Sequence, residues 1–138
     1  MLIATIPVKT YDSAKQHVFQ LSERADGIEL RLDYATYWDR EEVAALRSIC
    51  VLPVIFTLRS RAHGGYYSHA EDQRLQTILD LCALNPDYLD LEYDVSAQYL
   101  QTIRQRYPGL KIILSYHNFQ KTPANLSDLF QTIYQPDC

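Results

Sequence analysis

The sequence predicts an α/β fold in which parallel strands alternate with helices. Five short apolar runs alternate with five segments in which apolar residues recur at helical spacing. No hairpin signal joins neighbouring runs, which indicates parallel strands connected by helical crossovers. The runs LIATI, VIFTL and IIL are continuously apolar, which indicates strands that are buried on both faces.

The predicted strands and helices follow each other in regular order. Strands are expected at Leu2–Val8, Gly27–Asp33, Leu52–Leu58, Tyr88–Glu92 and Leu110–Tyr116. Helices are expected at Asp12–Arg24, Asp39–Ile49, Ala70–Leu84, Ser96–Arg106 and Asn125–Tyr134. The first and third helices carry their apolar residues on one side. Asp12 and Asp39 stand where helix N-caps belong, and Asn125 is a candidate N-cap for the last helix.

Length and charge exclude several classes of function. The chain has 138 residues, enough for one domain with a hydrophobic core. Its net charge of -4 and the lack of any basic run argue against a nucleic-acid or membrane partner. The longest apolar stretches are far shorter than the roughly 20 residues of a membrane span. The N-terminus MLIATIPV lacks the marks of a signal peptide, so a cytoplasmic protein is expected.

No motif in the sequence indicates a cofactor. Cys50, Cys82 and Cys138 are scattered, which is typical of reduced thiols and not of a metal site. There is no GxGxxG after the first strand and no GxxxxGK[ST] for a nucleotide phosphate. The Gly-Gly pair of HGG is either a flexible turn or part of a loop that covers a substrate. We therefore expect neither a metal nor a cofactor.

Two architectures fit this alternation, an open doubly wound sheet and part of a (β/α)8 barrel. Composition favours the open sheet, because five units complete such a domain but make only part of a barrel. The charged residues favour the barrel, because they stand at or near the C-terminal ends of four consecutive strands. In a barrel those ends meet at one mouth, where the active site lies, whereas an open sheet spreads them along an edge.

Arginine and carboxylate side chains stand on or just after the predicted strands. Glu29, Arg31 and Asp33 alternate along the second strand and share one of its sides. Three charges on a buried strand either form an ion-pair network or face a wet cavity. Arg59, just after the third strand, is either a surface residue or a planar binding group for a carboxylate substrate.

A histidine directly follows the last strand, in the segment LSYHNFQKTP. His117 is either a hydrogen-bonded residue at the rim of the core or the working group of a site. An imidazole titrates near neutrality, so it can take up a proton in one step and return it in another. An acid and an arginine are expected at other strands of the same array, and this combination with His117 favours a functional site.

The segments IELRLD, FTLRS followed by HGG, LDLE and LSYHNFQKTP resemble, in order and spacing, the type I 3-dehydroquinate dehydratases. The resemblance covers essentially the whole chain and implies a (β/α)8 TIM barrel. It also implies a lyase of the shikimate pathway, which leads to chorismate and the aromatic amino acids. The implied reaction converts 3-dehydroquinate to 3-dehydroshikimate and water, through an imine (Schiff base) between a lysine and the substrate ketone.

The resemblance further implies a role for each matching residue. Glu29, Arg31 and Arg59 match residues that bind the substrate. His117 matches the general acid and base, which takes a proton from C2 and protonates the departing C1 hydroxyl. The iminium makes the C2 proton more acidic. Three further residues are expected to contact the catalytic and substrate-binding groups without contacting the substrate, namely His63, Asp90 and Glu92.

The chain departs from the family pattern at two places. His63 stands where the family often has a glutamate close to the catalytic histidine, and a histidine raises the pKa of its neighbour less than a carboxylate does. The family's imine lysine lies on the strand after the fifth helix, which would begin where this chain stops. None of the lysines present follows that helix; they are Lys9, Lys15, Lys111 and Lys121. We therefore expect one domain over residues 1–138, incomplete at its C-terminus and inactive or a poor catalyst alone.

Three readings of the function stay open at this point. The first is a 3-dehydroquinate dehydratase whose lysine lies beyond this chain. The second is a catalytically dead substrate-binding or regulatory module derived from that family, and the third is an unrelated open sheet with structural charges. The expected partners are the small-molecule substrate and further copies, in a homo-oligomer or through open barrel edges. Some family members are fused to a shikimate dehydrogenase, and the sequence leaves that question open.

Overall fold

Five parallel strands form one sheet in the computed structural model, which describes residues 1–133. They are β1 (Ile3–Pro7), β2 (Gly27–Arg31), β3 (Val54–Thr57), β4 (Tyr88–Glu92) and β5 (Lys111–Ser115). Their spatial order is β1-β2-β3-β4-β5, the same as their order in the sequence. A doubly wound sheet reverses its order at a switch point, whereas a (β/α)8 barrel keeps the sequence order. The strand order therefore decides between the two predicted architectures in favour of the barrel type.

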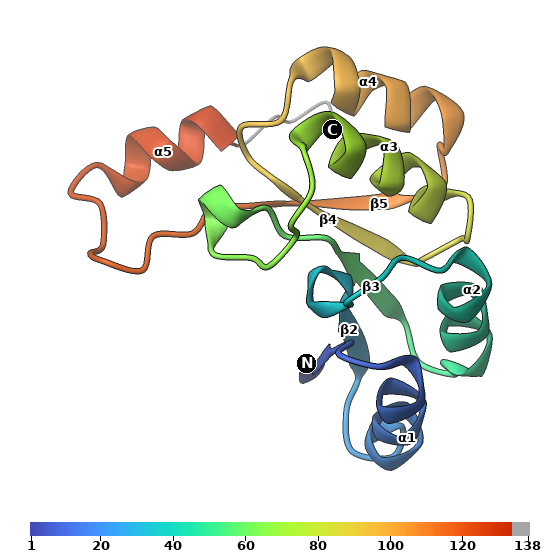
Figure 1. Cartoon of the computed structure of the whole chain (residues 1–138). Helices are drawn as coiled ribbons and strands as arrows, with labels where there is room; N and C mark the ends of the chain where they lie inside the picture. Colours follow the sequence, from blue (N-terminus) through green and yellow to red (C-terminus); the bar gives the residue numbers. More distant parts are fainter. Residues whose placement is uncertain (134–138) are drawn as a thin grey trace.

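Four helices cover one side of this sheet (Figure 1). They are α1 (Tyr11–Leu21), α2 (Arg40–Ile49), α3 (Glu71–Cys82) and α4 (Ala97–Arg106). Each connects one strand to the next, as a crossover must. Two short 3-10 turns, η1 (Leu32–Tyr34) and η2 (Arg61–His63), follow β2 and β3. The last helix, α5 (Leu126–Ile133), stands apart from the others in Figure 1, and none of its residues is buried.

The core lies between the sheet and the four covering helices. Side chains that point to the helices are fully buried, as at Ile6, Leu30, Phe56 and Leu89. The opposite side of the sheet, which we call the inner face, is only partly buried in residues 1–133, and Thr5 on it is exposed. The prediction of strands buried on both faces is thus wrong for this part of the chain, because helices cover only one face.

One of the three predicted helix caps, Asp39, is confirmed by side-chain hydrogen bonds. Asp39 caps α2, because its Oδ1 accepts hydrogen bonds from the N–H groups of Glu41 and Glu42 at 2.9 and 3.1 Å. Asn125 directly precedes α5, and its carbonyl accepts the N–H of Leu129. The cap of α1 is Thr10 and not Asp12, which lies inside the first turn.

The predicted element boundaries lie within three residues of the observed ones, and the difference at the end of the second strand moves a charged residue out of the strand. Pairing of β2 with β3 ends at Arg31, and Asp33 belongs to the turn η1. The predicted helix end at Tyr134 and the third cysteine, Cys138, lie outside the described residues. In the part that the structure describes, no helix is long and apolar enough to cross a membrane.

Candidate active site

Glu29 lies in the middle of β2 and is held by both neighbouring strands. Its Oε2 accepts a hydrogen bond of 2.7 Å from Thr5 Oγ1 of β1. Its Oε1 accepts one of 2.7 Å from Thr57 Oγ1 of β3. Hydroxyl donors orient a carboxylate without neutralising its charge. Glu29 is therefore a fixed anionic acceptor on the inner face.

Arg31, at the end of β2, is paired with Asp33 through two parallel hydrogen bonds. Nε lies 2.8 Å from Oδ1, and Nη2 lies 2.9 Å from Oδ2. The guanidinium also lies over the ring of Tyr34, 5.1 Å from its centroid. The prediction that Asp33 extends the strand beside Glu29 is wrong, because the turn η1 brings its carboxylate back to Arg31. The geometry fixes the plane in which Arg31 presents its remaining donors.

Arg59 follows β3 and joins it to the next two strands. Its Nη2 lies 2.8 Å from Asp90 Oδ1 of β4, and its Nη1 donates to Ser115 Oγ of β5 at 2.6 Å. Ser115 donates in turn to Asp90 Oδ1 at 2.8 Å. Burial raises the pKa of Asp90 to about 6, although Arg59 and Ser115 pull it down. The three side chains form one largely buried cluster at the carboxyl ends of three adjacent strands.

Glu92, at the end of β4, accepts hydrogen bonds from two sides. Its Oε1 accepts the backbone N–H of Ser60 at 2.8 Å and lies 4.0 Å from Arg59 Nη1. Its Oε2 accepts from Arg74 Nη1 at 2.9 Å. Burial alone would raise the pKa of Glu92, but the Ser60 N–H and the charge of Arg74 outweigh it and lower the pKa. Glu92 is thus a buried anion that fixes the backbone just after Arg59.

Arg74, on α3, is a part of this network that the sequence analysis missed. Its side chain is 3% exposed, and it donates to the carbonyl of Leu58 and to both oxygens of Glu71 besides Glu92. A signal was present in the sequence, because Arg74 stands four positions before Ile78 on the apolar face of the helix. A charge at such a position needs a buried partner.

His117 follows β5 and is partly buried. Its ring stacks on that of Phe119, with 6.1 Å between the centroids and an interplanar angle of 22°. Its Nδ1 is buried and has no hydrogen-bond partner. Burial lowers the pKa of His117, and the nearby charges of Arg59 and His63 lower it further. The imidazole is therefore predominantly neutral at pH 7 and able to accept a proton.

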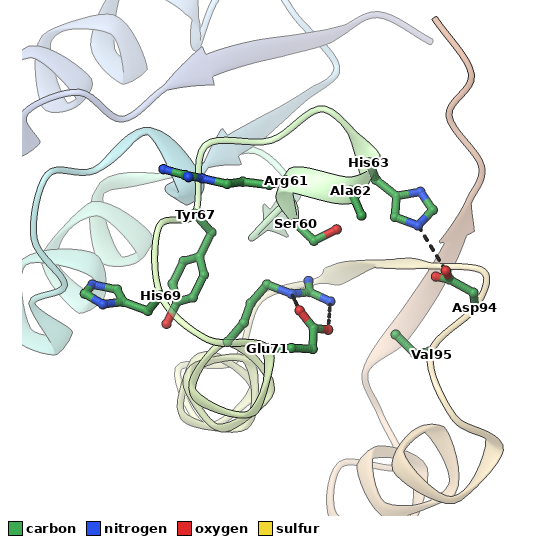
Figure 2. A pocket seen from close by; sticks show the side chains of 10 residues that line it. Ser60, Arg61, Ala62, His63, Tyr67, His69, Glu71, Asp94 and Val95 are labelled. Atoms are coloured by element: carbon green, nitrogen blue, oxygen red, sulfur yellow. Dashed lines mark hydrogen bonds and ion pairs between the residues drawn. The ribbon is translucent and has the colours of Figure 1, made fainter.

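His63 and Asp94 meet across the loops that follow β3 and β4, as Figure 2 shows. The distance between Nε2 and Oδ2 is 3.1 Å, and the side chain of His63 is 12% exposed. Both residues line a cavity of about 440 Å³, and Ser60 and Arg74 also line it, whereas Arg59 does not. Asp94 was missed, although it continues the alternation of acids in LDLEYD.

The two cysteines within residues 1–133 are not candidates for a nucleophile. Cys50 and Cys82 are buried free thiols. Burial raises the pKa of Cys50 to about 11 and that of Cys82 to about 12. A thiol with so high a pKa is inert at neutral pH, because the thiolate is the reactive form.

Glu29 lies in the middle of its strand, whereas the other predicted site residues lie at or beyond the carboxyl ends of the strands, and not all of them touch. Arg59, Asp90 and Glu92 form one connected network. Glu29 and Arg31 bond instead to threonines and to Asp33. Their charges still act on the other residues. The charge of Glu29 is among the causes that raise the pKa of Asp90, and the charge of Arg31 is among those that lower the pKa of His117. Charged side chains at the ends of β2, β3 and β4 thus lie on the same side of the sheet as the neutral His117 that follows β5.

This arrangement defines a class of protein. Parallel strands in sequence order, covered on one side by helices, form part of a (β/α)8 barrel. Charged side chains gather at the carboxyl ends of these strands, where barrel enzymes carry their active sites. The model of the family "Type I 3-dehydroquinase" matches residues 2–138. The chain belongs to this family.

Relatives and solved structures agree with this assignment. The chain is 37% identical over 128 residues to the 3-dehydroquinate dehydratase of Methanopyrus kandleri, covering 89% of this chain and 56% of that protein. It is 32% identical over 119 residues to the bifunctional 3-dehydroquinate dehydratase/shikimate dehydrogenase of Arabidopsis thaliana, covering 82% of this chain and 20% of that protein. The crystal structure of the 3-dehydroquinate dehydratase from Aquifex aeolicus superposes with a TM-score of 0.73 at 28% identity, covering 96% of this chain and 61% of that one. The chain thus spans a little over half the length of the single-function enzymes.

Proposed function

We propose that this protein takes part in the dehydration of 3-dehydroquinate to 3-dehydroshikimate and supplies the groups that bind the substrate and transfer its protons. The observation that carries the proposal is the environment of His117. A predominantly neutral imidazole with a buried, unpartnered nitrogen stands at the strand ends beside the Arg59 cluster. Membership of the type I 3-dehydroquinase family supports the same proposal.

In this proposal the arginines and Glu29 hold the substrate. Arg31 and Arg59 are oriented cations that suit the substrate carboxylate. Glu29 is an oriented acceptor that suits a substrate hydroxyl. Asp90 and Glu92 keep Arg59 in place, and Glu92 also fixes the chain at Ser60. Such fixed groups reduce the entropy that the reaction must lose to reach its transition state.

His117 moves the protons. It first removes the proton from C2 of the substrate, whose ketone is joined to a lysine as an imine. Electrons from the C–H bond are drawn toward the iminium nitrogen. The imidazolium then gives the proton to the C1 hydroxyl, which leaves as water while the C1–C2 double bond forms. A base whose pKa is lowered is well suited to the first step at neutral pH, because little of it is already protonated.

The imine lysine is proposed to come from a segment that pairs with the free edge of β5. The lysines within residues 1–133 have other surroundings. Lys15 pairs with Glu42, and Lys111 at the start of β5 lies over the ring of Tyr88. Lys9 and Lys121 are exposed. We further propose that residues 1–138 are one domain of the barrel, that the protein is cytoplasmic, and that its copies associate through the free strand edges.

The positions of these lysines also favour a second function, a substrate-binding or regulatory module without imine chemistry. One experiment separates the two. The protein is purified as its source makes it, incubated with 3-dehydroquinate and borohydride, and analysed by peptide mass. Turnover together with a reduced adduct on a lysine supports the enzyme. Saturable binding with neither turnover nor adduct supports the module, and the lack of both binding and turnover contradicts either function.

A further inference from the structure

The backbone on both sides of Arg59 is held by one buried ion pair. The side chains of Arg74 on α3 and Glu92 at the end of β4 are 3% and 2% exposed, with 2.9 Å between Nη1 and Oε2. The same Nη1 donates to the carbonyl of Leu58 at 2.8 Å. Glu92 Oε1 accepts the N–H of Ser60 at 2.8 Å. These two groups belong to the peptide bonds directly before and after Arg59, so one ion pair holds both peptide planes that flank it.

Holding these two planes fixes the direction in which the Arg59 side chain leaves the backbone. A peptide unit is planar, so φ and ψ are the only soft backbone angles at a residue. The angle φ turns the preceding plane and ψ turns the following one, and both planes are held. The Cα–Cβ bond of Arg59 therefore has one direction. Its guanidinium reaches Asp90 with Nη2 at 2.8 Å and Ser115 with Nη1 at 2.6 Å.

Gly65, in the loop that follows η2, packs on the same stretch of backbone. Its N–H donates to the carbonyl of Ser60 at 2.8 Å. A Cβ atom placed on Gly65 would lie 2.6 Å from the Cβ of Arg59 and closer still to its carbonyl oxygen, and real Cβ atoms do not approach other atoms so closely. The second glycine of the HGG segment is therefore required by this close approach of two backbones.

We propose that Arg74 is a positioning residue for substrate binding. Together with Glu92 and Gly65 it forms a rigid frame around the backbone of Arg59, and this frame aims the Arg59 guanidinium at the substrate carboxylate. Arg74 suits this role because a planar guanidinium can bond to a carbonyl and to carboxylates at the same time. In this role Arg74 acts through Arg59 and does not touch the substrate. The effect on the substrate rests on the proposed function.

Relaxation of ¹⁵N in the natural protein tests the frame without any substrate. The N–H of Arg59 lies in the same peptide plane as the carbonyl of Leu58, so its order parameter reports whether Arg74 holds that plane. In the wild type it should be about 0.85, the value of a rigid backbone. Arg74→Lys keeps a cation but is one bond shorter, so its nitrogen does not reach the place of Nη1, and the order parameter should fall below about 0.6. Ile103→Val, at a buried residue near the end of α4, should leave it unchanged, whereas no fall in Arg74→Lys would overturn the frame.

Kinetics test what the frame does for the substrate. Arg74→Lys should raise KM for 3-dehydroquinate about 10-fold, as expected when one charged hydrogen bond is weakened. It should change kcat less than about 2-fold, because the carboxylate is held alike in the ground state and the transition state. The control Ile103→Val should change neither. An unchanged KM, or a kcat that falls while KM stays the same, would overturn the role of Arg74 in binding.

A double-mutant cycle tests whether Arg74 acts through Arg59. Arg59→Met removes the guanidinium and keeps the backbone, so adding Arg74→Lys to it should raise KM no further. The same 10-fold rise in both backgrounds would overturn the proposal. Gly65→Ala disturbs the frame from a loop outside the core and should give the same pattern, which keeps the test decisive if the lysine variant does not fold. If the wild type neither binds nor converts 3-dehydroquinate, the proposed function fails, while the order parameter of the Arg59 N–H still decides whether the frame exists.

Discussion

Arg59 and Asp90 form a buried ion pair, with 2.8 Å between Nη2 and Oδ1 and with side chains 5% and 11% exposed. Ser115 bonds to both partners, so the pair ties β3 to β4 and β5 at the mouth of the sheet. A buried pair of this kind is costly to break, because the remaining charge is left unpaired. It also places a titratable carboxyl next to the proposed substrate-binding guanidinium.

The pKa of Asp90 predicts a pH dependence of folding stability. The pKa of Asp90 in the folded protein, about 6, lies above the ordinary aspartate value of 3.8, so ionisation of Asp90 disfavours the folded state. Protonated Asp90 makes its full contribution to the free energy of unfolding below about pH 4. This contribution is lost as the pH rises through about 6, a change of roughly 2–3 kcal/mol. Asp90→Asn removes this loss. Relative to the wild type, the variant should therefore gain about 2–3 kcal/mol between pH 4 and pH 7 in urea unfolding.

The comparison between variant and wild type isolates Asp90 from the other carboxyl groups. An exposed residue, Asp72, provides the control, because Asp72→Asn should show no such gain. If Asp90→Asn instead loses stability relative to the wild type as the pH rises, then Arg59 outweighs burial and the pKa of Asp90 is lowered.

Local patterns explain why most of the fold could be predicted. Helical periodicity and apolar runs are properties of neighbouring residues. The alternation of strands and helices, and the exact bounds of β4, could therefore be predicted from the sequence. Strand order is not local. Only the positions of charges at strand ends and the family motifs indicated a barrel. The predicted end of β2 was wrong because the carboxylate of Asp33 accepts hydrogen bonds from Arg31 and from the N–H of Tyr66. Alternation of side chains along one strand gives no information about such contacts.

The supporting groups of the site were harder to predict than its central residues. Arg59 and His117 stand at strand ends within recognisable motifs. Arg74 reaches Glu92 from a helix, and Asp94 reaches His63 from another loop. Such contacts depend on how two elements pack, and periodicity along one element does not reveal them. A charged residue on an apolar helix face was the one local sign of the first contact.

Arg74 is predicted to be the most sensitive residue of the network for stability. Arg74→Met keeps much of the side-chain volume but removes the cation that is hydrogen-bonded to Glu92, so that only Arg59, at 4.0 Å, is left beside this buried carboxylate. Breaking a buried ion pair in this way costs about 3–5 kcal/mol. Glu71→Gln, at an exposed partner of the same arginine, should cost at most about 1 kcal/mol. Urea unfolding of both variants checks the difference, and similar losses for the two would show that Glu92 does not need Arg74.

His117 is predicted to act in proton transfer and not in imine formation. In the natural protein, His117→Ala should reduce kcat by at least about 10²–10⁴-fold, the range of general acid–base groups. Borohydride trapping of the substrate imine should survive, because the nitrogen that attacks the ketone belongs to a lysine. Nearly unchanged turnover would move the proton-transfer role to another residue, with His63 the first to be tested.

The lowered pKa of His117 predicts the acid side of the pH profile. The removal of the C2 proton requires the neutral ring, so kcat/KM should fall only when the pH drops below the ordinary histidine value of 6.5. Burial and the charge of Arg59 are the first causes. Arg59→Met should therefore move this acid limb to higher pH besides weakening substrate binding. A wild-type limb above pH 6.5 would contradict a neutral, desolvated imidazole.

The 138-residue chain by itself is predicted to self-associate through its sheet. Within residues 1–133, β1 and β5 each pair with one strand only, so each presents a free backbone edge. The inner face between them carries Ile3, Ile55 and Ile113, which line an apolar cavity of about 110 Å³. Covering each roughly 100 Å² of such apolar surface is worth about 2.5 kcal/mol.

Light scattering on the isolated chain tests this association, and a charge on the inner face should oppose it. Ile113→Lys places an inward-pointing charge beside the edge of β5, a device by which natural sheets avoid pairing with each other. It should shift the mass toward the monomer. Val51→Lys, at a residue that is 81% exposed before β3, is the control and should leave the association unchanged. A monomeric wild type at every concentration tested would show that the free edges are protected in another way.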